Sequence, residues 1–200
     1  MADEVTSALR AKWDARYREA GANDREACGV LREFSHLLPA AGRALDLACG
    51  LGANALHLAR RGLGVVAWDL SPVAVESLRA RAAAAGMAVR AEVRDLVAQP
   101  PPHESFDVIV VSYFWEPRLC AVIMEALRPG GLLFYQTFVR AAVSTRGPSD
   151  SRYRLGTNEL LHAFAPLQLV LYREEGRIGD TSAGLRDEAM LIARRIEGAD

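Results

Sequence analysis

Cysteines and long apolar runs are scarce in this sequence, and each scarcity narrows the possible functions. The 200 residues contain 3 cysteines, which form no C-x-x-C pair and have no histidine at metal-ligand spacing: Cys28, Cys49 and Cys120. We therefore expect reduced thiols and no metal site. No run approaches the roughly 20 apolar residues of a membrane-spanning helix, and the charged amino terminus lacks the apolar core of a signal peptide. These features predict a soluble, cytoplasmic protein without membrane contacts.

An excess of charge of either sign is missing too. Lysine and arginine together number 24 and aspartate and glutamate 25, which gives a formal net charge of −1, while 50% of the residues are hydrophobic. Such a balance favours neither disorder nor a polyanion-binding surface, so nucleic acid is not an expected partner. The length favours one domain with a sizeable core.

Apolar runs alternate with amphipathic stretches from residue 44 onwards. Near-continuous apolar character is typical of strands that are covered on both faces, and it predicts strands at 44–48, 64–70, 88–96, 106–114 and 131–138. Helical spacing lies between them at 53–62, 71–86 and 117–131, with Ser71 as an N-cap and Gly62 and Gly86 at helix ends. The alternation predicts an α/β fold with an open parallel sheet that is wound on both faces.

The two ends of the chain do not follow this alternation of strands and helices. Helical stretches at 3–20 and 24–38 come first, and a helix at 157–167, with Thr157 as its N-cap, follows the fifth strand. Two strand-like runs at 168–175 and 187–196 are separated by a glycine-rich loop. Two strands joined in this way form a hairpin, so one of them must run antiparallel to the sheet.

A glycine-rich turn joins the first expected strand to its helix in the sequence "LDLACGLGANAL". Gly50, Gly52 and Ala55 fit the spacing G-x-G-x-x-A of a dinucleotide loop, which makes an NAD(P)-dependent oxidoreductase one candidate. Asp46 in the preceding strand would repel a pyrophosphate, however, and suits a ligand with a cationic group. Asp69 ends the next strand, where a carboxylate can accept hydrogen bonds from ribose hydroxyls.

Two further motifs narrow the choice. Asp95 ends the third expected strand, where it can accept a hydrogen bond from an adenine amino group while Leu96 supplies a backbone N–H and apolar contact. The sequence "LRPGGLLF" places a Pro-Gly-Gly turn before the fifth strand, and the hairpin follows.

In combination, these motifs resemble the class I S-adenosylmethionine-dependent methyltransferases over residues 40–196. The stretches "LDLACGLGANALHLARRG", "VVAWDLSPVAVESL" and "EAMLIARR" are similar to the tellurite-resistance methyltransferases and their small-molecule relatives. The resemblance implies a doubly wound, seven-stranded, mostly parallel sheet with one antiparallel strand, the Rossmann-like methyltransferase fold. It divides the chain into N-terminal helices (1–38), a cofactor-binding core (40–138) and a substrate-side segment with the C-terminal hairpin (139–200).

The resemblance also implies S-adenosylmethionine as cofactor and a small-molecule methyl acceptor, for example a thiol or a chalcogen oxyanion. Its cofactor-binding positions correspond here to Asp46, Ala48, Cys49, Gly50, Gly52, Asp69, Leu70, Asp95, Leu96, Ser112 and Tyr113. Ala48 departs from the family, which has glycine there, and we expect a negative φ at this alanine. A catalytically silent protein that binds the cofactor is a further alternative to an enzyme.

The candidate catalytic residues depend on the methyl acceptor. For an oxygen or nitrogen acceptor, the general bases to test are Tyr113, Glu116 and His57, although isolated histidines are more often structural. Trp13 and Tyr17 share a face of the first helix, which packs in the core or covers the cofactor. Four arginines after the fifth strand either clamp an anionic substrate or face solvent: Arg140, Arg146, Arg152 and Arg154.

Overall fold

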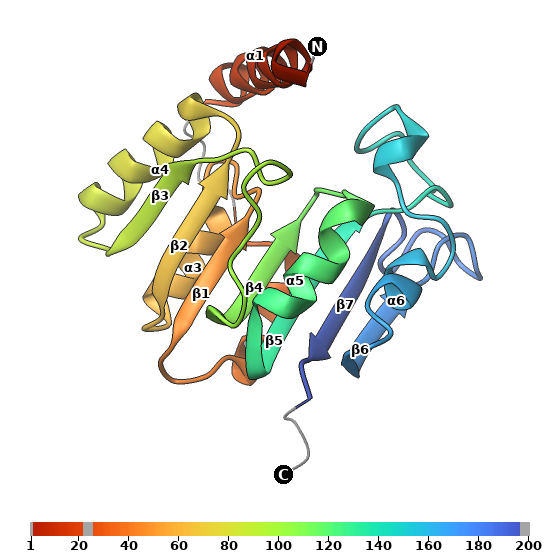
Figure 1. Cartoon of the computed structure of the whole chain (residues 1–200). Helices are drawn as coiled ribbons and strands as arrows, with labels where there is room; N and C mark the ends of the chain where they lie inside the picture. The colour runs from red at the N-terminus through yellow and green to blue at the C-terminus, as the bar shows by residue number, and fades with distance from the viewer. Residues whose placement is uncertain (1, 22–25, 197–200) are drawn as a thin grey trace.

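The computed structural model describes residues 2–21 and 26–196 and contains one seven-stranded sheet in the order β3-β2-β1-β4-β5-β7-β6 (Figure 1). The strands are β1 (Arg43–Leu47), β2 (Gly64–Asp69), β3 (Val89–Val93), β4 (Phe106–Ser112), β5 (Leu127–Phe138), β6 (Gln168–Glu174) and β7 (Glu188–Arg194). Neighbouring strands from β3 to β5 pair in parallel, whereas β7 runs antiparallel to both β5 and β6. The predicted fold class is confirmed, including the single antiparallel strand.

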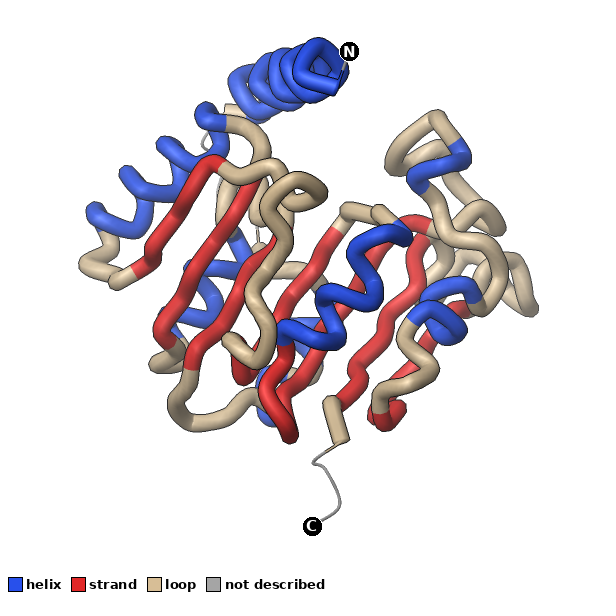
Figure 2. Tube along the Cα trace, viewed as in Figure 1, coloured by secondary structure: helices blue, strands red, loops and turns tan. Residues whose placement is uncertain are grey.

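Helices cover both faces of the sheet (Figure 2). The α-helices are α1 (Ala2–Ala20), α2 (Gly29–Glu33), α3 (Ala53–Arg60), α4 (Pro72–Ala84), α5 (Cys120–Ala126) and α6 (Glu159–Ala163), and the 3-10 helices are η1 (Ser35–Leu37), η2 (Pro117–Leu119) and η3 (Ser151–Tyr153). Buried side chains of α5 and α6 pack on one face, and those of α2, α3 and α4 pack on the other. This double cover explains why the central strands are apolar on both sides.

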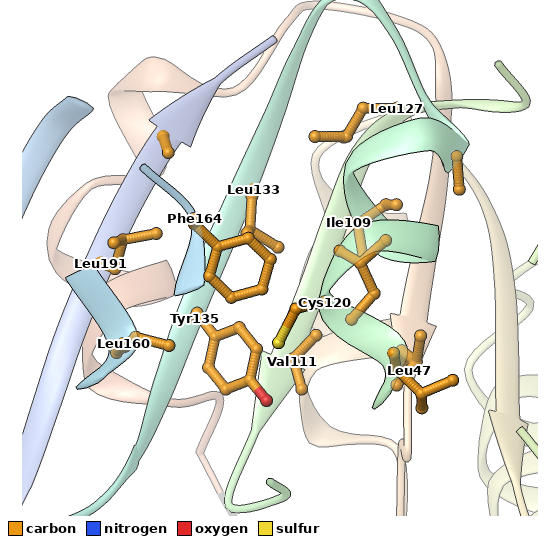
Figure 3. Close-up of a cluster of buried hydrophobic side chains, with 14 of the residues drawn as sticks. Leu47, Ile109, Val111, Cys120, Leu127, Leu133, Tyr135, Leu160, Phe164 and Leu191 are labelled. Atoms are coloured by element: carbon orange, nitrogen blue, oxygen red, sulfur yellow. The ribbon is translucent and has the colours of Figure 1, made fainter. Parts of the chain in front are cut away.

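The larger core cluster lies between the sheet and the helices α5 and α6 (Figure 3). Tyr135 on β5 is fully buried there, with its ring 5.5 Å from that of Phe164 and 6.1 Å from that of Trp115. Its hydroxyl donates a hydrogen bond of 2.9 Å to the Phe114 carbonyl oxygen, which satisfies the one polar atom of the ring. The contact ties β5 to the loop that follows β4.

Helix boundaries are where the sequence predictions fail. The stretch predicted as a helix at 24–38 contains only α2 and η1 within the described residues, while residues 22–25 lie outside them. The helix predicted at 117–131 ends at Ala126, because the chain there enters β5. The helix predicted at 157–167 is α6 alone, and Thr157 does not cap it: the preceding residue is Asn158, in a left-handed conformation with φ 58° and no side-chain cap.

The predictions for three helix ends are confirmed. The Ser71 hydroxyl accepts a hydrogen bond from the Ala74 N–H and caps α4, and both Gly62 and Gly86 follow helices with positive φ. Among the described residues, none of the helices is long and apolar enough to cross a bilayer.

Candidate functional site

The carboxyl ends of the parallel strands collect most of the residues that the sequence singled out. These ends point to one edge of the sheet, at which α1 also lies (Figure 1). Ligands of open α/β sheets bind at this edge. It is therefore the candidate active site.

Asp46, on the central strand β1, is fully buried. One of its carboxylate oxygens accepts a hydrogen bond of 2.9 Å from the Ala55 N–H in the first turn of α3, and the other accepts one of 3.4 Å from the Asn54 side chain. Burial raises the pKa of Asp46 to about 7, the two hydrogen bonds oppose that rise, and the nearby charge of Asp69 adds to it. Ionised Asp46 would gain from a cationic neighbour.

The loop from Ala48 to Gly52 contradicts one prediction. Ala48 has φ 57°, so the alanine adopts the left-handed conformation instead of the negative φ that we expected. The loop keeps the glycine-type backbone because its hydrogen bonds fix it: the Cys49 N–H donates to the Trp68 carbonyl and the Gly50 N–H to the Asp69 carboxylate. Cys49 itself is buried, which raises the pKa of its thiol well above the usual value.

Asp69 ends β2 next to this loop. Its carboxylate accepts hydrogen bonds of 2.8 Å from the N–H groups of Gly50 and Ser71, and it also hydrogen-bonds with the Tyr17 hydroxyl. Burial raises the pKa of Asp69, although these three donors lower it. Leu70, the next residue, is half-buried. Two buried carboxylates, Asp46 and Asp69, thus lie at the ends of neighbouring strands.

Asp95 lies two residues beyond the end of β3 and has a divided role. One oxygen accepts hydrogen bonds from the N–H groups of Val97 and Ala98, which is the capping role that an aspartate often takes at such a turn. The other oxygen accepts a hydrogen bond of 3.3 Å from the Thr6 hydroxyl of α1. Leu96 is buried in the core.

Helix α1 contacts the edge at three places along its length. The Thr6 hydroxyl donates to Asp95, Asp14 accepts a hydrogen bond from the Ser71 hydroxyl, and the Tyr17 hydroxyl reaches Asp69. A Cβ on Gly50 would lie 3.0 Å from the Tyr17 hydroxyl, so the loop and this tyrosine are in close contact. Trp13 stacks on the Tyr17 ring with centroids 5.7 Å apart. Both side chains lie at this edge and remain half-buried, outside the buried core clusters.

Ser112 and Tyr113 lie at the end of β4, on the other side of β1. The Asn54 amide donates to the Ser112 hydroxyl at 2.8 Å as well as to Asp46, so one side chain connects the two strand ends. Tyr113 has φ 56°, a conformation that costs a non-glycine residue energy and that clusters at functional sites. Burial raises the pKa of its hydroxyl to about 12, and the Glu188 charge adds to the effect.

Sequence reasoning missed two polar residues beside Tyr113. Gln136 on β5 donates to the carboxylate of Glu188, the first residue of β7, and accepts a 2.7 Å hydrogen bond from the Val30 N–H. Glu188 is 3% exposed. The signal that could have revealed both is a polar residue inside an otherwise apolar strand, since such a side chain is costly to bury without partners.

The other two candidate bases have partners elsewhere. The Glu116 carboxylate forms an ion pair with Arg118, which lowers its pKa, and caps η2. His57 hydrogen-bonds with Ser35 on the side of α2 and η1, and burial followed by the charges of nearby arginines lowers its pKa. Among the three candidates, only Tyr113 directly follows a strand of the parallel sheet, next to Ser112 at the end of β4.

The arginines after β5 also differ from one another. Arg152 pairs with Asp150 at the surface, Arg140 with Glu159, and Arg154 donates to backbone carbonyls. Arg146 alone of the four pairs with Glu188, at 2.8 Å.

Comparison with known proteins is consistent with this arrangement. Residues 44–131 match a family model described as "Methyltransferase domain". The Ubiquinone biosynthesis O-methyltransferase of Methylocella silvestris is 28% identical over 165 residues, which cover 71% of this chain but 63% of that protein, so the chain spans less than two thirds of this relative's length.

Solved structures agree on the fold. TehB from Haemophilus influenzae has a TM-score of 0.70 at 19% identity, over 92% of this chain and 67% of that one. A structure from work on the conversion of a disulfide bond into a thioacetal group during echinomycin biosynthesis has a TM-score of 0.71 at 23% identity, over 96% of this chain and 94% of that one.

Proposed function

We propose that the chain is a class I S-adenosylmethionine-dependent methyltransferase that moves the methyl group of this cofactor to a small-molecule acceptor. The match of residues 44–131 to a methyltransferase domain and the fold shared with TehB support this proposal. The observation that carries the proposal is the pair of buried carboxylates, Asp46 and Asp69, which flank a left-handed glycine loop at the carboxyl edge. Carboxylates there suit a ligand with hydroxyls and an ammonium group, and they would repel a pyrophosphate.

The residues present fit the parts of the cofactor. Asp69 with Leu70 would accept hydrogen bonds from the ribose hydroxyls, and Asp95 with Leu96 would hold the adenine. The methionine portion would lie along the loop with Asp46, at Ala48, Cys49, Gly50 and Gly52. Ser112 and Tyr113 would face the transferred methyl group. Gly50, with φ 50°, allows the left-handed turn of the loop without a Cβ, so that a ligand could approach the loop backbone closely.

S-adenosylmethionine supplies a methyl group that its positively charged sulfur has already activated. The chain therefore has to orient the reactants and exclude water, and orientation alone can account for most of the rate. Helix α1 is placed for the second task, because Thr6, Asp14 and Tyr17 bind across the edge from Asp95 to Asp69. Tyr17 would then cover the site, and its hydroxyl already hydrogen-bonds with the Asp69 carboxylate.

The acceptor we favour is nucleophilic without a strong base, such as a thiol or a chalcogen oxyanion. Tyr113 keeps its proton at neutral pH, as a tyrosine ordinarily does, and its raised pKa suits it to donate a hydrogen bond more than to act as a general base. Glu116 and His57 have other partners. We also propose that the protein acts in the cytoplasm and does not use nucleic acid as a substrate.

The test is release of S-adenosylhomocysteine, followed across a panel of thiols, chalcogen oxyanions and phenols. We expect turnover of a thiol or oxyanion by the wild-type protein. Tight cofactor binding without turnover of any acceptor would instead favour a silent binding protein.

Asp69→Ala tests the placement of the ribose. We expect this variant to bind S-adenosylhomocysteine more weakly by roughly 1–3 kcal/mol, since hydrogen bonds to a charged group are lost. Isothermal titration calorimetry measures the difference, with Asp150→Ala in the loop after β5 as the control. An unchanged dissociation constant for Asp69→Ala would mean that the ribose lies elsewhere.

A further inference from the structure

Glu188 accepts hydrogen bonds from two separate segments at the Tyr113 side of the edge. Arg146 in the loop after β5 donates to one oxygen at 2.8 Å, and Gln136 on β5 donates to the other. In addition to burial, the charge of this carboxylate acts on the Tyr113 hydroxyl and helps to raise its pKa. A buried carboxylate with two side-chain donors is firmly placed, and it fixes the side chains that donate to it.

Arg146 differs from Arg154, its neighbour in this loop, in how its guanidinium is used. All three guanidinium nitrogens of Arg154 donate to backbone carbonyls, including that of Arg146, so Arg154 serves to hold the loop. The Arg146 guanidinium uses one nitrogen on Glu188 and lies 5.9 Å from the centroid of the Phe138 ring. Most of its side chain is exposed, so its other N–H groups can reach a ligand.

Exposure decides which charge an incoming ligand meets. The Arg146 side chain is 64% exposed, whereas that of Glu188 is 4% exposed. Asp187, which precedes Glu188, is mostly buried and accepts hydrogen bonds from the Ser144 hydroxyl and from two backbone N–H groups. From solvent, this part of the edge presents a cation beside the exposed ring of Tyr113.

We propose that the methyl acceptor carries an anionic group, and that Arg146 binds this group while Glu188 positions Arg146. The inference rests on the proposed function, because it assigns the acceptor to the same site. A guanidinium held at one end by a carboxylate offers its other N–H groups in a fixed plane, which suits the two oxygens of a carboxylate or an oxyanion. Tyr113 follows Ser112 at the end of β4, so the anionic group would be bound next to the proposed position of the methyl group.

Two thiols that differ by one carboxylate test the proposal. Calorimetry first titrates the protein with S-adenosylhomocysteine and then titrates the complex with 4-mercaptobenzoate or with benzenethiol. We expect the wild-type complex to bind 4-mercaptobenzoate about tenfold more tightly or better, because a hydrogen bond to a charged group contributes on that scale.

The variants assign the preference to residues. Arg146→Gln should abolish the preference for 4-mercaptobenzoate over benzenethiol. Glu188→Gln should reduce the preference in the same direction, and Glu188→Asp should restore part of it, an effect on selectivity that a merely structural role would not produce. Arg152→Gln, in the same loop, should leave the preference intact. Because Arg146 is exposed, its variant decides the question even if Glu188→Gln fails to fold.

The outcomes distinguish a failure of the proposed methyltransferase function from a failure of the proposed anionic acceptor. If S-adenosylhomocysteine does not bind in the first titration, the proposed function is wrong. If it binds but the wild-type complex does not prefer 4-mercaptobenzoate, or if Arg146→Gln keeps the preference, the anionic acceptor is wrong and the methyltransferase proposal stands.

Discussion

Ala48 is the residue at which local preference and loop geometry conflict most clearly. Its φ of 57° places a Cβ in the left-handed region, which costs an ordinary L-residue roughly 1–2 kcal/mol. The neighbouring backbone hydrogen bonds from Cys49 and Gly50 leave the chain no alternative path. The sequence identified Ala48 as a departure from the family pattern. It could not show whether the loop would change its conformation or Ala48 would adopt the left-handed one.

Ala48→Gly should therefore stabilise the protein. Relief of the left-handed strain should raise the free energy of unfolding by roughly 1–2 kcal/mol. The greater freedom of glycine in the unfolded chain should lower it by roughly 0.5–1 kcal/mol. Urea denaturation measures the difference. Ala80→Gly, in the exposed middle of α4, is the control and should be destabilising by about 1 kcal/mol. If both variants lose stability equally, Ala48 carries no strain.

Asp46 makes stability depend on pH in an unusual direction. Its pKa rises from 3.8 to about 7 on folding, so the native state holds a proton that the unfolded state has released between these values. The resulting stability is complete below the unfolded pKa and is lost as the pH rises through about 7.

Asp46→Asn removes this titration and should flatten the fall in unfolding free energy between about pH 4 and pH 7. Asp69, whose pKa is also raised, continues to contribute in the variant. Denaturation at a series of pH values compares the two proteins. An identical slope in wild type and variant would show that Asp46 is already ionised when folded.

At the scale of elements, the packing of the loop before α3 against α4 depends on Gly52, which precedes α3 with φ 80°. A Cβ at this position would lie 2.2 Å from Leu78 Cδ1 in α4, and Leu78 is fully buried. The glycine thus allows both a left-handed turn and the close approach of this loop to α4.

Gly52→Ala should lose more stability than Gly86→Ala. Gly86 has φ 62°, but nothing lies within 4 Å of the position that a Cβ would take, so its variant reports the backbone strain of roughly 1–2 kcal/mol alone. Crowding against Leu78 should add about 1–3 kcal/mol. Chemical denaturation of both variants gives the comparison, and equal losses would mean that α4 moves away at no cost.

The elements also differ in how far the sequence predicts them. Buried strands such as β1 and β4 were predictable, because a strand that is covered on both faces must be apolar along its length. Helix ends were not: Thr157 has the chemistry of a cap, yet the chain turns at Asn158, and β5 begins before the Pro-Gly-Gly turn that marked its expected start. Short helices at loops depend on tertiary contacts that local preference does not contain.

For the whole molecule, the sequence predicted the strand-end aspartates and the hairpin but not what lies across the edge. The placement of α1 depends on single contacts from Thr6, Asp14 and Tyr17, which no periodicity reveals. Glu188 and Gln136 are distant in sequence and meet only because β7 inserts beside β5. The contacts of α1 and the contact between Glu188 and Gln136 both lie at the edge that we propose binds the cofactor and the acceptor.

The most direct test of the proposed cofactor site is thermal unfolding in the presence of S-adenosylhomocysteine or of NAD. A ligand that binds only the native state raises the melting temperature. We predict a rise with S-adenosylhomocysteine that Asp69→Ala diminishes, and no rise with NAD. Stabilisation by NAD, without any by S-adenosylhomocysteine, would contradict the proposed cofactor site and the function built on it.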